Sequence, residues 1–120
     1  MSGGITFKDN EYWCVAGWCF RAVIRSVVDY LSRNDKYDLH AFLTDEDNNI
    51  ELIIEEIDTI NWPKDKAIYF YGAICKGYEQ SVELGRSDWK DPSYFDRFIE
   101  HYEKLSNIAK INIQSIDEHT

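Results

Sequence analysis

The chain has 120 residues, of which 44% are hydrophobic and 15% aromatic, so it has the composition of a single folded domain (residues 1–120) rather than of a disordered segment. Its 22 acidic and 13 basic residues give a net charge of −9. This balance argues against a direct nucleic-acid surface and against an anionic membrane surface, since both attract clustered Lys and Arg.

The first predicted element is a helix over residues 10–33. Asp9 or Asn10 is the expected N-cap, and Glu11 lies in the first turn, where the helix dipole favours an acid. The apolar side chains recur at three- and four-residue spacing, which indicates one buried helical face: Trp13, Ala16, Phe20, Val23, Ile24, Val27, Val28 and Leu31.

The middle of the chain is predicted as a three-stranded meander, with a helical alternative. Residues 38–44, 50–57 and 66–75 are the expected strands. Their β-branched and aromatic content, together with Gly72 and Gly77, favours extended structure. A helical period also fits two sets of residues here: Ile50, Ile53, Ile54, Ile57 and Ile60, and then Ala67, Ile68, Tyr71, Ile74, Cys75 and Tyr78.

A second helix is predicted over residues 92–107, with Asp91 as N-cap and Pro92 at the first helical position. Its apolar stripe consists of Tyr94, Phe95, Phe98, Ile99, Tyr102 and Leu105. Residues 108–116 alternate in polarity and are expected to add an edge strand. The predicted fold is therefore α+β, with two layers: an antiparallel sheet of three to four strands packed by two long helices. The alternative is an all-α bundle.

Two further features favour a cytoplasmic location. The first residues carry no basic signal region, and no apolar run is long enough to span a bilayer. Cys14, Cys19 and Cys75 are odd in number and form no short pairing motif, so reduced thiols are expected.

Most of the net charge falls in one window, between Tyr37 and Pro63. The window has no Lys or Arg and contains eight carboxylates: Asp38, Asp45, Glu46, Asp47, Glu51, Glu55, Glu56 and Asp58. Outside it, 14 acidic residues nearly balance the 13 basic ones. Concentrated like charge weakens the compact state and attracts opposite charge, so this window favours a role in binding something basic.

Part of the acidic window is spaced like a calcium-binding loop. Asp45, Asp47, Asn49 and Glu51 match its early ligand positions, and Glu56 lies eleven residues after Asp45. The sixth position of such a loop needs Gly for a sharp turn, but here it is occupied by a β-branched isoleucine. An acidic turn is the better interpretation, and no metal is predicted.

No catalytic motif is present. His40, His101 and His119 match no metal or catalytic spacing, and there is no glycine-rich phosphate loop. The chain is therefore predicted to be no enzyme and to hold no cofactor. A small enzyme or ligand-binding protein with a pocket around His101, His40 or Cys75 stays an alternative, because such partners need only be adjacent in space.

The run from Asp45 to Glu51, the run from Glu55 to Asp58 and the nearby rings give the chain a recognisable character. It resembles bacterial toxin-immunity proteins of contact-dependent growth inhibition and related polymorphic toxin systems. The resemblance implies a basic toxin partner of the nuclease class, whose substrate-binding Lys and Arg are neutralised by carboxylates. The expected partner-binding residues are Asp45, Glu46, Asp47, Glu51, Glu55, Glu56 and Asp58, with Trp62 as an anchor. A generic protein-interaction adaptor is the third hypothesis.

Overall fold

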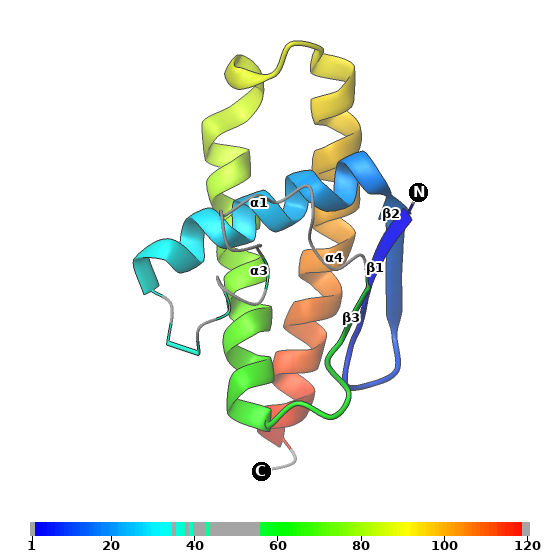
Figure 1. Ribbon diagram of the computed structural model, residues 1–120, viewed down its shortest axis with the longest axis vertical. Helices are drawn as coiled ribbons and strands as arrows, with labels where there is room; N and C mark the ends of the chain where they lie inside the picture. Colours follow the sequence, from blue (N-terminus) through cyan, green and yellow to red (C-terminus); the bar gives the residue numbers. More distant parts are fainter. Residues whose placement is uncertain (1, 35, 38, 40–42, 44–55, 119–120) are drawn as a thin grey trace.

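Helices and a small sheet form separate layers in the computed structural model, which describes residues 2–34, 36–37, 39, 43 and 56–118. The elements in chain order are β1 (Ser2–Thr6), β2 (Tyr12–Ala16), α1 (Gly17–Asn34), β3 (Glu56–Asp58), α3 (Lys64–Leu84), the short 3-10 helix η2 (Gly85–Asp88) and α4 (Pro92–Glu118). α3 and α4 lie side by side, α1 crosses both, and the sheet lies along one side of the helices (Figure 1).

The sheet has the strand order β2-β1-β3 and is mixed. β1 pairs antiparallel with β2, where Ile5 faces Trp13, and parallel with β3, where Ile5 faces Ile57. The predicted α+β class is confirmed and the all-α alternative is wrong. The prediction of a purely antiparallel sheet is also wrong, because α1 and the residues after it return the chain to the sheet with β3 parallel to β1.

The helix predicted from residue 10 begins at Gly17, because the preceding residues form a hairpin. The Phe7 N–H donates to the Glu11 carbonyl at 2.9 Å, and Asn10 adopts φ 72°, a left-handed conformation that asparagine tolerates in turns. The Asp9 carboxylate accepts the Glu11 N–H at 2.9 Å. Asp9 and Asn10 are thus turn residues rather than caps, and the residues of β2 alternate between exposed and buried.

The strand predicted over residues 66–75 is wrong: this segment lies within α3. Its strand-forming side chains also follow a helical period, and the helix buries Ala67, Phe70, Tyr71, Ile74 and Cys75 on one face. That face packs between α1 and α4. Burial of a continuous apolar stripe outweighs the weaker β-propensity of the individual residues.

The helix predicted over residues 92–107 is confirmed, and it continues to Glu118. Asp91 caps it as expected, since its Oδ1 accepts the Ser93 N–H at 2.9 Å and the Ser93 hydroxyl at 2.7 Å. The edge strand predicted over 108–116 is wrong. Ala109, Asn112 and Ile116 are buried at helical spacing, and the Asn112 Oδ1 accepts the Asp9 N–H at 3.2 Å.

The remaining middle predictions fall mostly on residues 38, 40–42 and 44–55, which lie outside the described residues. Of the strand predicted over 38–44, Leu39 and Leu43 are described; both are helical and buried, so extended structure is wrong at these two positions. The end of the strand predicted over 50–57 is confirmed, since Glu56 and Ile57 lie in β3.

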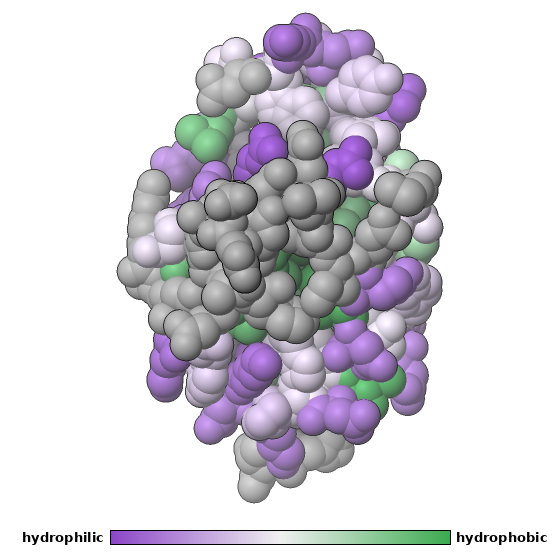
Figure 2. Space-filling view, in the orientation of Figure 1, coloured by the Kyte–Doolittle hydropathy of each residue, from purple (hydrophilic) through white to green (hydrophobic). Residues whose placement is uncertain are grey.

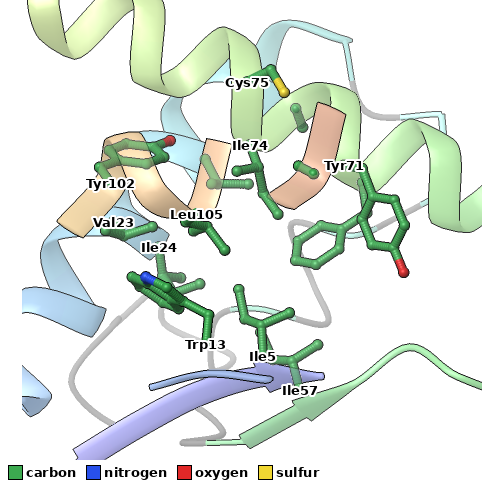
Figure 3. Close-up of a cluster of buried hydrophobic side chains, with 14 of the residues drawn as sticks. Ile5, Trp13, Val23, Ile24, Ile57, Tyr71, Ile74, Cys75, Tyr102 and Leu105 are labelled. Carbon is green, nitrogen blue, oxygen red and sulfur yellow. The ribbon is translucent and has the colours of Figure 1, made fainter. Parts of the chain in front are cut away.

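The core lies between the sheet and the helices. Figure 3 shows Ile5, Trp13 and Ile57 pointing from the sheet towards side chains of α1, α3 and α4. Trp13 also donates its indole N–H to the His101 carbonyl of α4 at 3.1 Å. Since one side of the sheet is buried in this way, the opposite side is left facing outward. No helix in the described part of the chain combines the length and the apolarity needed to cross a membrane.

Candidate functional site

The side of the sheet that faces away from the helices is the candidate site, and we call it the outer sheet face. Side chains alternate between the two sides of a strand, and the register places Gly4 beside Cys14 on one neighbour and beside Glu56 on the other. The outer sheet face therefore consists of Ser2, Gly4, Thr6, Tyr12, Cys14, Ala16, Glu56 and Asp58. It contains two carboxylates and neither Lys nor Arg.

Tyr12 lies across the middle of this face and joins all three strands. Its hydroxyl donates to the Glu56 Oε1 at 2.7 Å, so the ring crosses β1 to reach β3. A Cβ atom placed on Gly4 would lie 2.5 Å from the Tyr12 Oη and 2.7 Å from ring carbons, which means that the ring covers Gly4 closely. Even so, 48% of the Tyr12 surface is exposed.

The hydrogen bonds on this face leave negative charge facing outward. The bond to Glu56, followed by the neighbouring Cys14 thiol, raises the pKa of the Tyr12 hydroxyl, which therefore stays protonated and a donor. The Asp58 Oδ1 accepts the Ile60 N–H at 3.0 Å, which holds that carboxylate at the end of β3. Both carboxylates are exposed.

Two of the predicted partner-binding residues, Glu56 and Asp58, thus lie together on the outer sheet face. Asp45, Glu46, Asp47, Glu51 and Glu55 lie outside the described residues. Trp62 is half-buried, with its ring centroid 5.4 Å from that of Phe70 and the Lys66 Nζ 4.2 Å from the centroid. Part of the Trp62 ring is therefore buried by packing against α3. The role of Trp62 as an anchor for a partner stays a prediction.

Tyr12 and Gly4 are not among the predicted site residues, because the sequence pattern predicts a helix over residues 10–33 that includes Tyr12. Two signals could have found them: the turn residues Asp9 and Asn10, and the aromatic and β-branched side chains of Tyr12, Trp13 and Val15 that follow. Together these indicate a hairpin, and a hairpin places Tyr12 on the same side as Gly4.

Among the described residues proposed for a catalytic pocket, no hydrogen bond joins Cys75 to His101. The Cys75 thiol is buried and lies 3.7 Å from the Ser106 carbonyl, and burial raises its pKa, so it is a poor nucleophile. His101 is half-buried on α4, where its carbonyl binds Trp13. His40 lies outside the described residues.

The described residues line at least two grooves, and neither of these contains His101 or Cys75. The first, of about 400 Å³, lies where α1 crosses α3 and α4, and its lining includes Ser26 and Ser81, whose hydroxyl oxygens are 3.0 Å apart. The second, of about 370 Å³, is lined by Lys36, Tyr37, Asp65, Ile68 and Tyr69. Neither brings a histidine or cysteine next to a base, so neither has the arrangement of an activated nucleophile.

The surface in the view of Figure 2 is mainly hydrophilic where it is described, with hydrophobic side chains in small separate patches. Within the described ranges, no three His, Cys, Asp or Glu side chains are grouped so as to hold a metal ion. Comparisons with protein-family models, with curated proteins and with solved structures found no match. The chemistry that the outer sheet face itself supports is the pairing of its carboxylates with cations.

Proposed function

We propose that this chain is an immunity-type inhibitor that binds and neutralises a basic toxin domain, of the nuclease class, in the cytoplasm. The observation that carries the proposal is the outer sheet face, where Glu56 and Asp58 are exposed beside Tyr12 and none of the described side chains is a Lys or Arg. β3 directly follows the acidic residues 45–55 in the chain, so the outer sheet face is joined to the rest of the acidic window.

Such a surface inhibits by occupying cations that the partner needs for its substrate. A nuclease binds phosphate with Lys and Arg, and carboxylates presented at the same spacing compete for those side chains. The net charge of −9 attracts a basic partner over a distance and raises the association rate. Salt screens this attraction, since the Debye length is about 8 Å at physiological ionic strength.

The test uses the full chain as bait in a lysate of the source cell, at low and at high salt. We expect capture of one basic protein, weakened at high salt, and inhibition of that protein's nuclease activity by the chain. A double variant, Glu56→Lys with Asp58→Lys, should bind the captured protein at least about tenfold more weakly, because each reversal turns an attraction into a repulsion. A triple variant tests the acidic run that precedes β3, and it carries Asp45→Lys, Glu46→Lys and Asp47→Lys.

A matched control carries the same charge change elsewhere. Glu79 and Glu83 are exposed on α3, so Glu79→Lys with Glu83→Lys should leave most of the affinity intact. Circular dichroism of every variant checks that it is folded. Equal affinity of all three variants, or a captured protein whose activity is unaffected, would contradict the proposal and direct attention to the two grooves.

A further inference from the structure

The position of the Tyr12 ring requires glycine at residue 4. The distal part of the ring lies over Gly4, at distances where any side chain on residue 4 would push it away. The hydrogen bond from the Tyr12 hydroxyl to Glu56 holds the far end of the ring. One side of the ring is therefore fixed against the sheet, and the other side contributes to the 48% of this residue that is exposed.

Two other rings that reach the surface, the exposed Tyr94 and the half-buried Trp62, already have a cation of their own. The Arg97 guanidinium lies 5.3 Å from the Tyr94 centroid, and the Lys66 Nζ lies 4.2 Å from that of Trp62. Tyr94 is exposed to a similar extent as Tyr12, at 43%. Among the described residues, Tyr12 has no such cation, and a carboxylate lies at the end of its ring instead.

A ring next to a carboxylate is complementary to one kind of side chain in particular. Guanidinium is planar, stacks on aromatic rings and donates N–H groups in a fork that fits a carboxylate. The lysine ammonium is a compact, strongly hydrated charge. It is less able than guanidinium to contact the face of the ring and bind the carboxylate at the same time. The arrangement therefore favours arginine over lysine.

We propose that Tyr12 and Glu56 together bind an arginine side chain of the basic partner, with the guanidinium stacked on the exposed side of the ring and its N–H groups donating to the Glu56 carboxylate. Asp58 lies two residues further along β3 on the same side, roughly 7 Å away, and pairs with a second cation. This inference rests on the proposed function and adds to it the chemical group that the outer sheet face recognises.

The test titrates the full, nitrogen-15-labelled chain with hexa-arginine and with hexa-lysine and follows the backbone amides by NMR. We expect hexa-arginine to shift the amides of Gly4, Tyr12 and Glu56, and to bind about three- to thirtyfold more tightly than hexa-lysine. Tyr12→Leu should abolish that preference. Glu56→Gln should weaken the binding of both peptides, and Tyr12→Phe, which keeps the ring but loses its hydrogen bond, should give an intermediate preference.

Two matched controls test whether the arginine preference depends specifically on Tyr12 and Glu56. Tyr94→Leu removes a ring of similar exposure, and Glu83→Gln removes an exposed carboxylate on α3; both should retain the arginine preference. The inference is overturned if hexa-arginine does not bind at low salt, if the amide shifts fall elsewhere, or if Tyr12→Leu keeps the preference.

Its failure is distinguishable from failure of the proposed function. Equal capture of the basic toxin by the wild type and by Tyr12→Leu refutes the arginine site and leaves the inhibitor function standing. An arginine preference that depends on Tyr12, without any captured toxin that the chain inhibits, supports the arginine site and refutes the inhibitor function.

Discussion

Two glycine–tyrosine pairs occur in this protein, and they differ in what surrounds them. On the outer sheet face, the Tyr12 ring covers Gly4, is half exposed and donates its hydroxyl to Glu56. Between α3 and α4, the Tyr102 hydroxyl approaches Gly77 so closely that a Cβ there would collide with it. Both glycines make room for a tyrosine, but only the first tyrosine presents a surface to a partner.

The buried pair serves packing. Tyr102 is fully buried, its hydroxyl has no hydrogen-bond partner among the described residues, and burial raises its pKa well above the ordinary value. The Ser26 carbonyl of α1 lies 3.3 Å from where a Cβ of Gly77 would be, so three helices meet at this glycine. In both pairs the tyrosine requires a neighbouring residue without a side chain. Where the tyrosine is enclosed, this requirement gives tight packing, and where it is exposed, it gives a preorganised surface.

The largest effect is expected from Gly77→Ala. The added methyl group must displace the Tyr102 hydroxyl and crowds the Ser26 carbonyl of α1, and such overpacking should lower the free energy of unfolding by about 3 kcal/mol. Urea denaturation measures this. Gly72→Ala is the matched control in the same helix: nothing lies within 4 Å of its Cβ, so it should stabilise by up to about 1 kcal/mol.

Tyr102→Phe tests whether the Tyr102 hydroxyl is the group that requires glycine at residue 77. It removes a hydroxyl that has no partner, so by itself it should be neutral or slightly stabilising. Combined with Gly77→Ala, it should recover more than half of the lost stability. A double variant as unstable as Gly77→Ala would show that the α1 backbone, and not the tyrosine, requires glycine here.

The second effect concerns the buried thiol of Cys19. Burial raises its pKa from 9.0 to about 11, so the unfolded chain ionises this group at a lower pH than the folded chain does. The contribution of the protonated Cys19 thiol to stability is therefore fully present below pH 9. As the pH rises from 9 to 11, this contribution is lost and the free energy of unfolding falls by about 2 kcal/mol. Denaturation at pH 8 and at pH 11 measures the loss, and Cys19→Ala should lose less over this range. An equal loss in both chains would assign the pH dependence to other groups.

The smallest effect on stability is expected from Gly4→Ala. The added methyl group displaces the Tyr12 ring towards solvent and breaks its exposed hydrogen bond to Glu56, so the free energy of unfolding should fall by no more than about 1 kcal/mol. Binding of hexa-arginine should nevertheless weaken as far as in Tyr12→Leu, and the double variant should lose nothing more. A stability loss as large as that of Gly77→Ala would remove the distinction between the two pairs.

The parts of the fold that could be predicted are those where local pattern and tertiary burial agree. The stripe from Phe20 to Leu31 lies in one predicted helix, and Asp91 caps the other as predicted. The wrong predictions of secondary structure lie where the sequence is compatible with both a helix and a strand. Tyr12 to Ala16 fits both a helix and a strand, and so do residues 66–75. Propensity is too weak to choose between such alternatives, and packing against a distant element decides.

The candidate site shows the same division. The acidic window could be identified from the sequence alone, because the absence of Lys and Arg from a charged segment needs no fold to be recognised. The link between Tyr12 and Glu56 could not be identified, because these residues are 44 positions apart and meet only across β1.

By itself, the sequence determined the acidic character of one segment, most of α1 and the start of α4. These properties depend on composition and on contacts between residues close in the chain. Only the tertiary structure decided that residues 66–75 are helical, that β3 pairs parallel with β1, and that Gly4 carries the ring of Tyr12. The physical reason is that burial is a property of the whole fold, and a strand's outer side becomes a surface only once its inner side has been covered.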